Sequence, residues 1–150
     1  MGWLRAGRNS KSEGADTMNT KDIRNALKSR LAGGAIGPSA AWPNVNHNGT
    51  QPYFDTSFTG IVREGGTLKG NEILSETGQF NAVIVVDQGG GEDAAADYAD
   101  AVAALFPEGQ RISITGGEIV IRRPVDIRGG YPTDADYRVP VAIHYRATAA

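Results

Sequence analysis

Three glycines at 89–91 stand between the most apolar stretch of the chain and its longest helical pattern, an order that suggests a phosphate-binding loop. Such a loop needs backbone N–H groups at a helix N-terminus that no negative charge already occupies. Here Glu92 and Asp93 follow the glycines directly, and no lysine followed by serine or threonine is present there. These carboxylates sit at the positive end of the helix dipole and repel an anion. The sequence therefore predicts a flexible connection and not a phosphate site.

Metal and catalytic sites have no better support. The two histidines, His47 and His144, lie far apart without the spacing of zinc ligands, so both are predicted to face solvent. The chain has no cysteine, and no serine has the local context of a nucleophile. Asp97 and Asp100 fall on the exposed side of a predicted helix, where solvation explains them. We therefore expect no catalytic residue, no metal, no cofactor and no enzymatic activity.

The densest positive cluster consists of Arg122, Arg123 and Arg128. Arginines in such a cluster can contact an acidic protein surface or the phosphates of nucleic acid. A solvated strand end is the more common explanation, and no aromatic residues are interleaved as single-strand binding requires. The sequence leaves these interpretations open.

Length and charge bound the class of protein. A chain of 150 residues forms one domain of ordinary size, able to bury about 68–70% of the surface that its unfolded form exposes. A formal net charge of -2 provides no global basic surface for nucleic acid. The absence of cysteine fits a reducing compartment or a virion.

The N-terminal stretch differs in composition from the rest. Residues 1–17 mix glycine, serine and charges of both signs, and they contain no apolar run long enough for a signal peptide or membrane span. We expect a flexible or partner-ordered arm there, then one domain over residues 18–150, and no contact with a membrane. Met18 offers an alternative start of translation.

The elements that would position these residues begin with a helix that Asn19 or Thr20 can cap. Gly33 and Gly34 are predicted to end it. Its apolar positions share the spacing of one helical face and are Ile23, Ala26, Leu27 and Leu31.

The next stretch alternates between irregular and extended patterns. Residues 37–52 hold three prolines and are predicted to form no regular element, with Trp42 covering the core. Residues 53–58 are predicted to form a half-buried strand with Phe54, Thr56 and Phe58 on one face. Residues 63–78 predict a long loop or a protruding hairpin arm that binds a surface.

The centre of the chain predicts a strand followed by a helix. Residues 79–86 are apolar on both faces, which indicates a central strand covered on both sides by helices or by a neighbouring subunit. The helix is predicted from near Glu92 until Pro107 and Gly109. Its buried face is expected to hold Ala95, Tyr98, Val102, Leu105 and Phe106.

Residues 111–121, RISITGGEIVI, predict a β-hairpin with four isoleucines on one face. The turn is predicted at Gly116 and Gly117. The resulting partners are Ile114 with Ile119, and Ile112 with Ile121.

The C-terminal third continues this pattern. An interrupted strand through Val125 and Ile127 and a loop over 129–136 lead to an alternating last strand over 137–145, in which Pro140 indicates an edge position or a bulge. The order helix, strand, strand, helix, hairpin, strand predicts an α+β fold. Its sheet is expected to be mainly antiparallel, with two helices packed on one face.

Several stretches of the chain together resemble the phage tail terminator family. They are WPN at 42–44, QPYFDTSF at 51–58, GQFNAVIVVDQ at 78–88, ADYADAVAALF at 96–106 and YRVPVAIHYRA at 137–147. The resemblance covers about residues 18–146 and lies in the order and local sequence of these stretches, not in a catalytic motif.

This resemblance implies a structural protein of a long-tailed phage or a gene transfer agent, made in the host cytoplasm and located in the virion at the head-proximal end of the tail. Such proteins form a hexameric ring on the major tail tube protein, end tube growth, and join the head-tail connector or stopper protein. DNA would pass through the lumen without specific binding. The alternatives are a head-to-tail stopper of the same particle or a small-ligand-binding or enzymatic domain.

A ring subunit must present two different patches, because head-to-tail contacts are heterologous. We expect contacts with neighbours or the tube in residues 63–78 and 122–131. The predicted interface residues are Arg63, Lys69, Arg122, Arg123, Arg128 and Tyr131.

Overall fold

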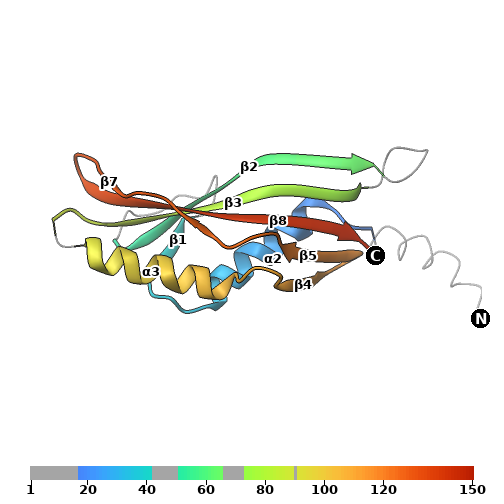
Figure 1. Cartoon of the computed structure of the whole chain (residues 1–150), viewed down its shortest axis with the longest axis horizontal. Helices are drawn as coiled ribbons and strands as arrows, with labels where there is room; N and C mark the ends of the chain where they lie inside the picture. The colour runs from blue at the N-terminus through green and yellow to red at the C-terminus, as the bar shows by residue number, and fades with distance from the viewer. Residues whose placement is uncertain (1–16, 42–50, 66–72, 90) are drawn as a thin grey trace, which may run out of the picture.

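The structure is a computed structural model of the chain and describes residues 17–41, 51–65, 73–89 and 91–150 (Figure 1). Two helices and eight strands within these ranges confirm the α+β class. The helices are α2 (Thr20–Gly33) and α3 (Glu92–Leu105). The strands are β1 (Ser39–Ala41), β2 (Tyr53–Gly65), β3 (Ile73–Asp87), β4 (Arg111–Ile114), β5 (Gly117–Ile121), β6 (Asp126–Ile127), β7 (Tyr131–Pro132) and β8 (Asp136–Ala149).

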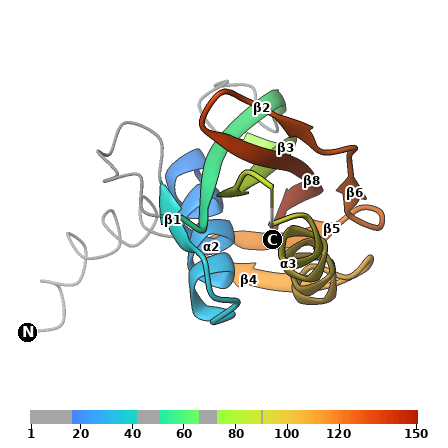
Figure 2. The same cartoon turned by 90° about the vertical axis from the view of Figure 1, so that its left-hand side faces the viewer.

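The strands form one curled sheet in the order β1-β2-β3-β8-β5-β4, with β6 and β7 also pairing with β8 (Figure 2). The sheet is mixed, because β1 runs parallel to β2 whereas the other pairs are antiparallel. The predicted order lacked β1 and β7, whereas β6 lies in the interrupted strand that was predicted through Val125 and Ile127. Strands of two or three residues are too short to show the alternation that reveals a strand in a sequence, and β1 falls where no regular element was expected.

The core lies on the concave face of the sheet, where both helices pack (Figure 2). Phe54 and Thr56 are buried on this face, as predicted, and Phe58 packs against the core. Phe80 is fully buried, stacks on Phe58 with 4.7 Å between ring centroids, and meets Phe106 edge-on at 6.4 Å. Three aromatic rings from β2, β3 and the end of α3 thus link the sheet to the helical layer.

The predicted helix faces are confirmed. Asn19 is the N-cap of α2, and its side-chain Oδ1 accepts a hydrogen bond from the Asp22 backbone N–H at 2.8 Å. The buried side of α2 holds Ile23, Leu27 and Leu31, with Ala26 packed beside them. The buried residues of α3 are Ala95, Ala99 and Val102, followed by Phe106, with Tyr98 and Leu105 partly buried.

β3 occupies the predicted central position, between β2 and β8. It is longer than predicted. Of the two alternatives for residues 63–78 the structure shows the hairpin, which we call the arm, since β2 and β3 remain paired out to Gly65 and Ile73. The base of this arm does not protrude from the sheet, because residues 75–78 also pair with β8. One extra residue enters β2 between Thr59 and Val62, at Gly60, whose φ of +62° favours glycine. Before this bulge the even-numbered residues of β2 face the concave side, and beyond it the odd-numbered residues do.

The predicted hairpin register is wrong by two residues, although all four isoleucines do join one core. Thr115 and Gly116 form the turn, so Ile112 pairs with Ile119. Gly116 takes the positive φ of +80° that the turn needs. Gly117 belongs to β5, where a Cβ would lie 2.4 Å from the Thr148 carbonyl oxygen. This close approach of β8 requires a glycine at 117 for packing rather than for turning.

The last strand forms where it was predicted, but its burial does not alternate, because the five residues from 141 to 145 are all buried, and β8 is not an edge strand. Pro140 pairs with Val83 of β3, and its carbonyl oxygen accepts a hydrogen bond from the Arg128 backbone N–H at 2.9 Å. Because the N–H and C=O of one strand residue point to the same side, the donor that proline lacks would face the break between β6 and β7. Proline is tolerated there without a lost ladder bond.

Candidate interaction surface

The base of the arm formed by β2 and β3 holds a fully buried carboxylate, Glu76. Its Oε1 accepts hydrogen bonds from the Thr20 hydroxyl at 2.7 Å and the Arg63 Nε at 3.3 Å, and its Oε2 accepts one from the Tyr145 hydroxyl at 3.0 Å. Arg63 also donates to the Thr20 hydroxyl. A buried carboxylate is tolerated only when it is paired and hydrogen-bonded, and these partners come from α2, β2 and β8. The network therefore fixes the arm to the body.

Gly78 makes room for this network. It pairs with Tyr145 across β3 and β8, and a Cβ at residue 78 would lie 2.6 Å from the Tyr145 hydroxyl oxygen. Burial, followed by the nearby charge of Glu76, raises the pKa of Tyr145. The phenol thus stays protonated and serves as a donor to Glu76.

The bulge at Gly60 sets which arm residues face outward. In the register after the bulge, Arg63 pairs with Glu76 and lies on the concave side. Val62 pairs with Thr77 and emerges on the opposite, convex face, with 61% of its surface exposed. The arm therefore presents an apolar side chain outward and keeps its arginine partly engaged at the base.

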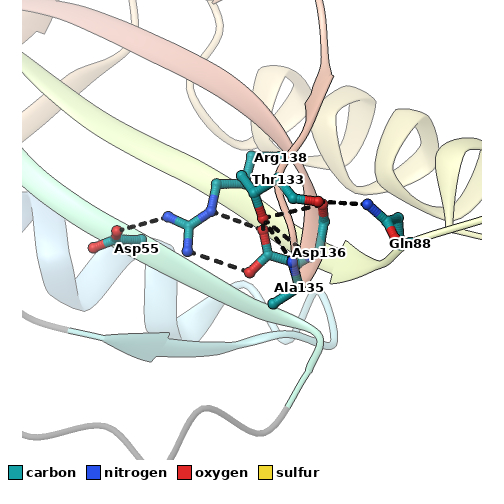
Figure 3. A network of polar contacts seen from close by, with 6 residues as sticks. All are labelled: Asp55, Gln88, Thr133, Ala135, Asp136 and Arg138. Carbon is teal, nitrogen blue, oxygen red and sulfur yellow. Dashed lines mark hydrogen bonds and ion pairs between the residues drawn. The ribbon is translucent and has the colours of Figure 1, made fainter.

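At the other end of the sheet, Arg138 joins β8 to β2 across β3 (Figure 3). Its Nε and Nη2 donate to the two carboxylate oxygens of Asp136 at 3.0 and 3.3 Å, and its Nη1 lies 3.4 Å from an Asp55 oxygen. Hydrogen bonds from Arg138 and then from Thr133 lower the pKa of the Asp136 carboxyl. In the register, Arg138 and Tyr53 flank Val85, which is fully buried on the convex face.

The middle of the convex face carries four arginines, which we call the arginine face: Arg122, Arg123, Arg128 and Arg146. Arg146 lies on β8 opposite Val120 of β5, and the Arg122 backbone N–H donates to the His144 carbonyl oxygen at 2.9 Å. Arg122, Arg128 and Arg146 are exposed, and their guanidinium groups make no ion pair within the part of the chain that the structure describes. The arginines of the predicted cluster thus share one face of the sheet with Arg146, which sequence spacing alone did not connect to them, and their role in an interface stays a prediction.

His144 contradicts its prediction. It is buried with 8% of its surface exposed, because loop residues from the β5–β6 connection cover it. Its Nε2 lies 2.7 Å from an Asp126 carboxylate oxygen, and the Arg123 Nη2 lies 3.2 Å from its Nδ1. The hydrogen bond with His144 is the main cause that lowers the pKa of Asp126. Arg123 is thus engaged inside the subunit, whereas the guanidinium groups of Arg122, Arg128 and Arg146 make no hydrogen bond or ion pair with any residue that the structure describes.

A shallow depression of about 330 Å³ lies beside these arginines on the convex face. Arg128, Pro140 and Ala142 border it from the β8 side, and polar residues of β2 and β3 line the rest. Asn81 Nδ2 donates to the Thr59 hydroxyl at 2.9 Å, and Gln79 Nε2 donates to Asn81 Oδ1 at 2.8 Å. These bonds hold the polar side chains of the floor in place, where they can donate and accept hydrogen bonds on contact with another surface.

The glycine run differs from the predicted flexible connection at its last member. Gly91 is buried as the N-cap of α3, and a Cβ there would lie 2.5 Å from a Val86 methyl carbon. Close packing of the helix start on β3 therefore demands a glycine. Glu92 and Asp93 occupy the first turn, as the argument against anion binding assumed.

The other predicted residues are dispersed. Tyr131 lies on β7 with 45% of its surface exposed, away from the arginine face along β8. Lys69, Trp42 and His47 lie outside the described residues. Within the described ranges, no group of three potential metal ligands occurs, and no helix is long and apolar enough to cross a membrane.

Comparison with known proteins gives a family and a fold. The model of a family described as phage tail terminator protein matches residues 22–145. A solved structure without a functional name is 21% identical and superposes with a TM-score of 0.72, covering 89% of this chain and 98% of the other. At this identity the likeness concerns the fold alone. No curated protein matches the sequence.

Proposed function

The chain belongs to the phage tail terminator family, and from this premise we propose that it caps the head-proximal end of the tail tube as a ring, stops tube growth and provides the surface to which the head connector or stopper protein binds. Membership makes the chain a structural component of the phage tail that acts in tail completion, and it argues against an enzyme. The ring, its six copies and its place at the tube end are the proposed part.

The observation that carries the proposal is the family match across nearly the whole described domain. The structure supports it through the two sides of one subunit. The helices of the same subunit cover the concave face. The convex face presents exposed arginines, a polar depression and the exposed side chain of Val62. A subunit whose core is covered by its own helices can use the opposite face of its sheet for contact with other subunits.

The experiment compares tails made with and without this chain. In a lysate that lacks it, we expect tubes that exceed the normal length and carry no heads, because nothing stops polymerisation. Adding the purified chain should restore tubes of normal length with a ring visible at one end in electron micrographs. Tubes of normal length joined to heads in the absence of the chain would contradict the proposal.

A shortened arm gives a finer test. Deleting residues 66–72 leaves Glu76 and its partners in place and should leave a folded protein. If the arm contacts the tube or a neighbour, as proposed, the variant should fail to join tubes to heads. Full yields of complete particles would remove the arm from the contact surface without affecting the rest of the proposal.

A further inference from the structure

The outward side of α3 is acidic. Glu92, Asp93, Asp97 and Asp100 are exposed there, and we call them the acidic side of α3. The helix contains no lysine or arginine. None of the four carboxylates makes a hydrogen bond or an ion pair with any residue that the structure describes. Ala96 is exposed between them and Ala104 one turn beyond Asp100, so small side chains accompany the carboxylates on this side.

This arrangement does not stabilise the isolated subunit. Asp93 with Asp97, and Asp97 with Asp100, are like charges at the i,i+4 and i,i+3 spacings at which they repel. Only Glu92 and Asp93, in the first turn, gain from the helix dipole. Aspartate within a helix is also a poor helix former. These aspartates lower the stability of the isolated subunit. We therefore expect their function to lie in contact with a cationic partner.

The same chain presents a matching cationic surface on its other side. Arg122, Arg128 and Arg146 are exposed on the convex face, and Arg128 borders the polar depression there. The acidic side of α3 belongs to the layer that packs against the concave face of β3 and β8 (Figure 2). The sheet separates the two surfaces, so they cannot meet within one subunit.

We propose that the acidic side of α3 in one copy packs on the arginine face of the next copy. This inference rests on the proposed ring and names its subunit interface. The contact is heterologous, because each copy contributes a different surface to its two neighbours, and such contacts form closed rings when the rotation closes. The alanines let the helix approach the polar floor closely, and the carboxylates lie opposite the three unpaired arginines. The convex face of the sheet thereby gains a helical cover from its neighbour.

A charge-swap experiment tests the interface. One variant carries Asp97→Lys with Asp100→Lys, and the other carries Arg128→Glu with Arg146→Glu. All four positions are exposed, and circular dichroism checks that both variants fold. Each variant alone should self-associate roughly 10- to 100-fold more weakly than the natural chain, by sedimentation velocity and on purified tubes. Raising the salt concentration should weaken association of the natural chain as well.

The two variants mixed in equal amounts should regain association. In an alternating ring, one type of contact is then natural and the other is its charge-reversed copy. All four substitutions in one chain should also restore assembly. A mixture that stays as weak as either variant alone would overturn the proposal. The matched control is Asp134→Lys compared with Asp97→Lys, since Asp134 is exposed but belongs to neither surface.

Cysteine cross-linking gives a second readout, because the chain has no cysteine of its own. Thr59→Cys, beside the depression, and Ala96→Cys, on α3, combined in one chain should give a ladder of disulfide-linked oligomers on oxidation. Rings that form without this ladder would overturn the proposed interface while leaving the ring itself intact. If the acidic-side variant self-associates normally but no longer binds tubes, the occupant of the surface is the tube protein and the proposal is wrong. Failure of the natural chain to cap tubes would instead count against the proposed function.

Discussion

The two faces of the β2–β3–β8 sheet are built from the same strands but are covered in different ways. On the concave face, Phe54, Phe80 and Ile143 are buried under the subunit's own helices. On the convex face, Val85 is buried between Tyr53 and Arg138 in the register, and the described part of the chain places no second helical layer above it. An apolar residue on a strand therefore indicates that the position is buried, but not which part of the molecule covers it. Long side chains that extend over their neighbours can replace a packed layer.

The largest expected difference between the faces is in packing. Phe80→Ala should lower the free energy of unfolding by about 3–5 kcal/mol, because it empties the centre of the aromatic stack. Gln79→Ala, one residue away on the convex face, should lower it by less than about 1 kcal/mol. Urea denaturation measures both values. Similar losses at residues 79 and 80 would contradict the assignment of a single core to the concave face.

The buried carboxylate at the arm base should rank next. Glu76→Ala removes the acceptor of the buried Tyr145 hydroxyl, and should lower the free energy of unfolding by about 1–3 kcal/mol. Glu76→Gln retains an acceptor oxygen and should lose less. The comparison of the two variants in urea, with proteolysis of the arm as a local probe, separates the hydrogen bond from the shape of the side chain. Equal losses would show that the charge and not the acceptor matters.

The convex-face network should reveal itself through pH. The pKa of Asp136 lies below its unfolded value of 3.8 in the folded chain, so its contribution is present above that value and is lost as pH falls through the folded pKa. Asp136→Asn should therefore lower the free energy of unfolding by about 1–2 kcal/mol near neutral pH. The gap between natural chain and variant should shrink below pH 3.8. A gap that stays constant into strong acid would contradict the ion pair with Arg138.

The smallest effect should have the opposite sign. Asp97→Ala should raise the free energy of unfolding by about 0.5 kcal/mol, because alanine is the better helix former and two repulsions disappear. The same variant should weaken self-association. Thermal melting and sedimentation of one preparation measure both. A loss of stability would indicate that Asp97 has a stabilising contact inside the subunit, and would remove it from the proposed interface.

Much of the fold could be predicted because the hydrophobic periodicity of a segment and its composition indicated the same secondary structure. The alternation of residues 53–58 and 137–145, the apolar stripe of α2 and the two-sided strand at 79–86 each correspond to an observed element. The failures came from backbone contacts that residue types do not display. Gly117 is a glycine because β8 passes close to it, and Gly91 because α3 packs on β3. A sequence shows that a position is glycine without showing which neighbour requires it.

The candidate surface was harder to predict than the fold. The cluster of Arg122, Arg123 and Arg128 was visible because its members are close in sequence. Arg146 joins them only through the pairing of β8 with β5, and this pairing of two strands distant in the sequence was not predicted. His144 was expected in solvent because its burial comes from loop residues with no periodic pattern. Charge on a strand thus identifies a candidate contact, but the set of its members requires the sheet order.

The extra residue at Gly60 has a consequence for how this protein can change over evolution. Inserting or deleting one residue between the bulge and the tip would exchange inward and outward positions along that part of β2, sending Arg63 away from Glu76 and Val62 toward it. Adding or removing two residues would restore the orientation of every side chain beyond the change. The paired part of β2 beyond the bulge, residues 62–65, should therefore change in length by even numbers among related proteins, unless a second bulge compensates. Because of the one extra residue at Gly60, what matters in this part of β2 is whether the number of residues is odd or even.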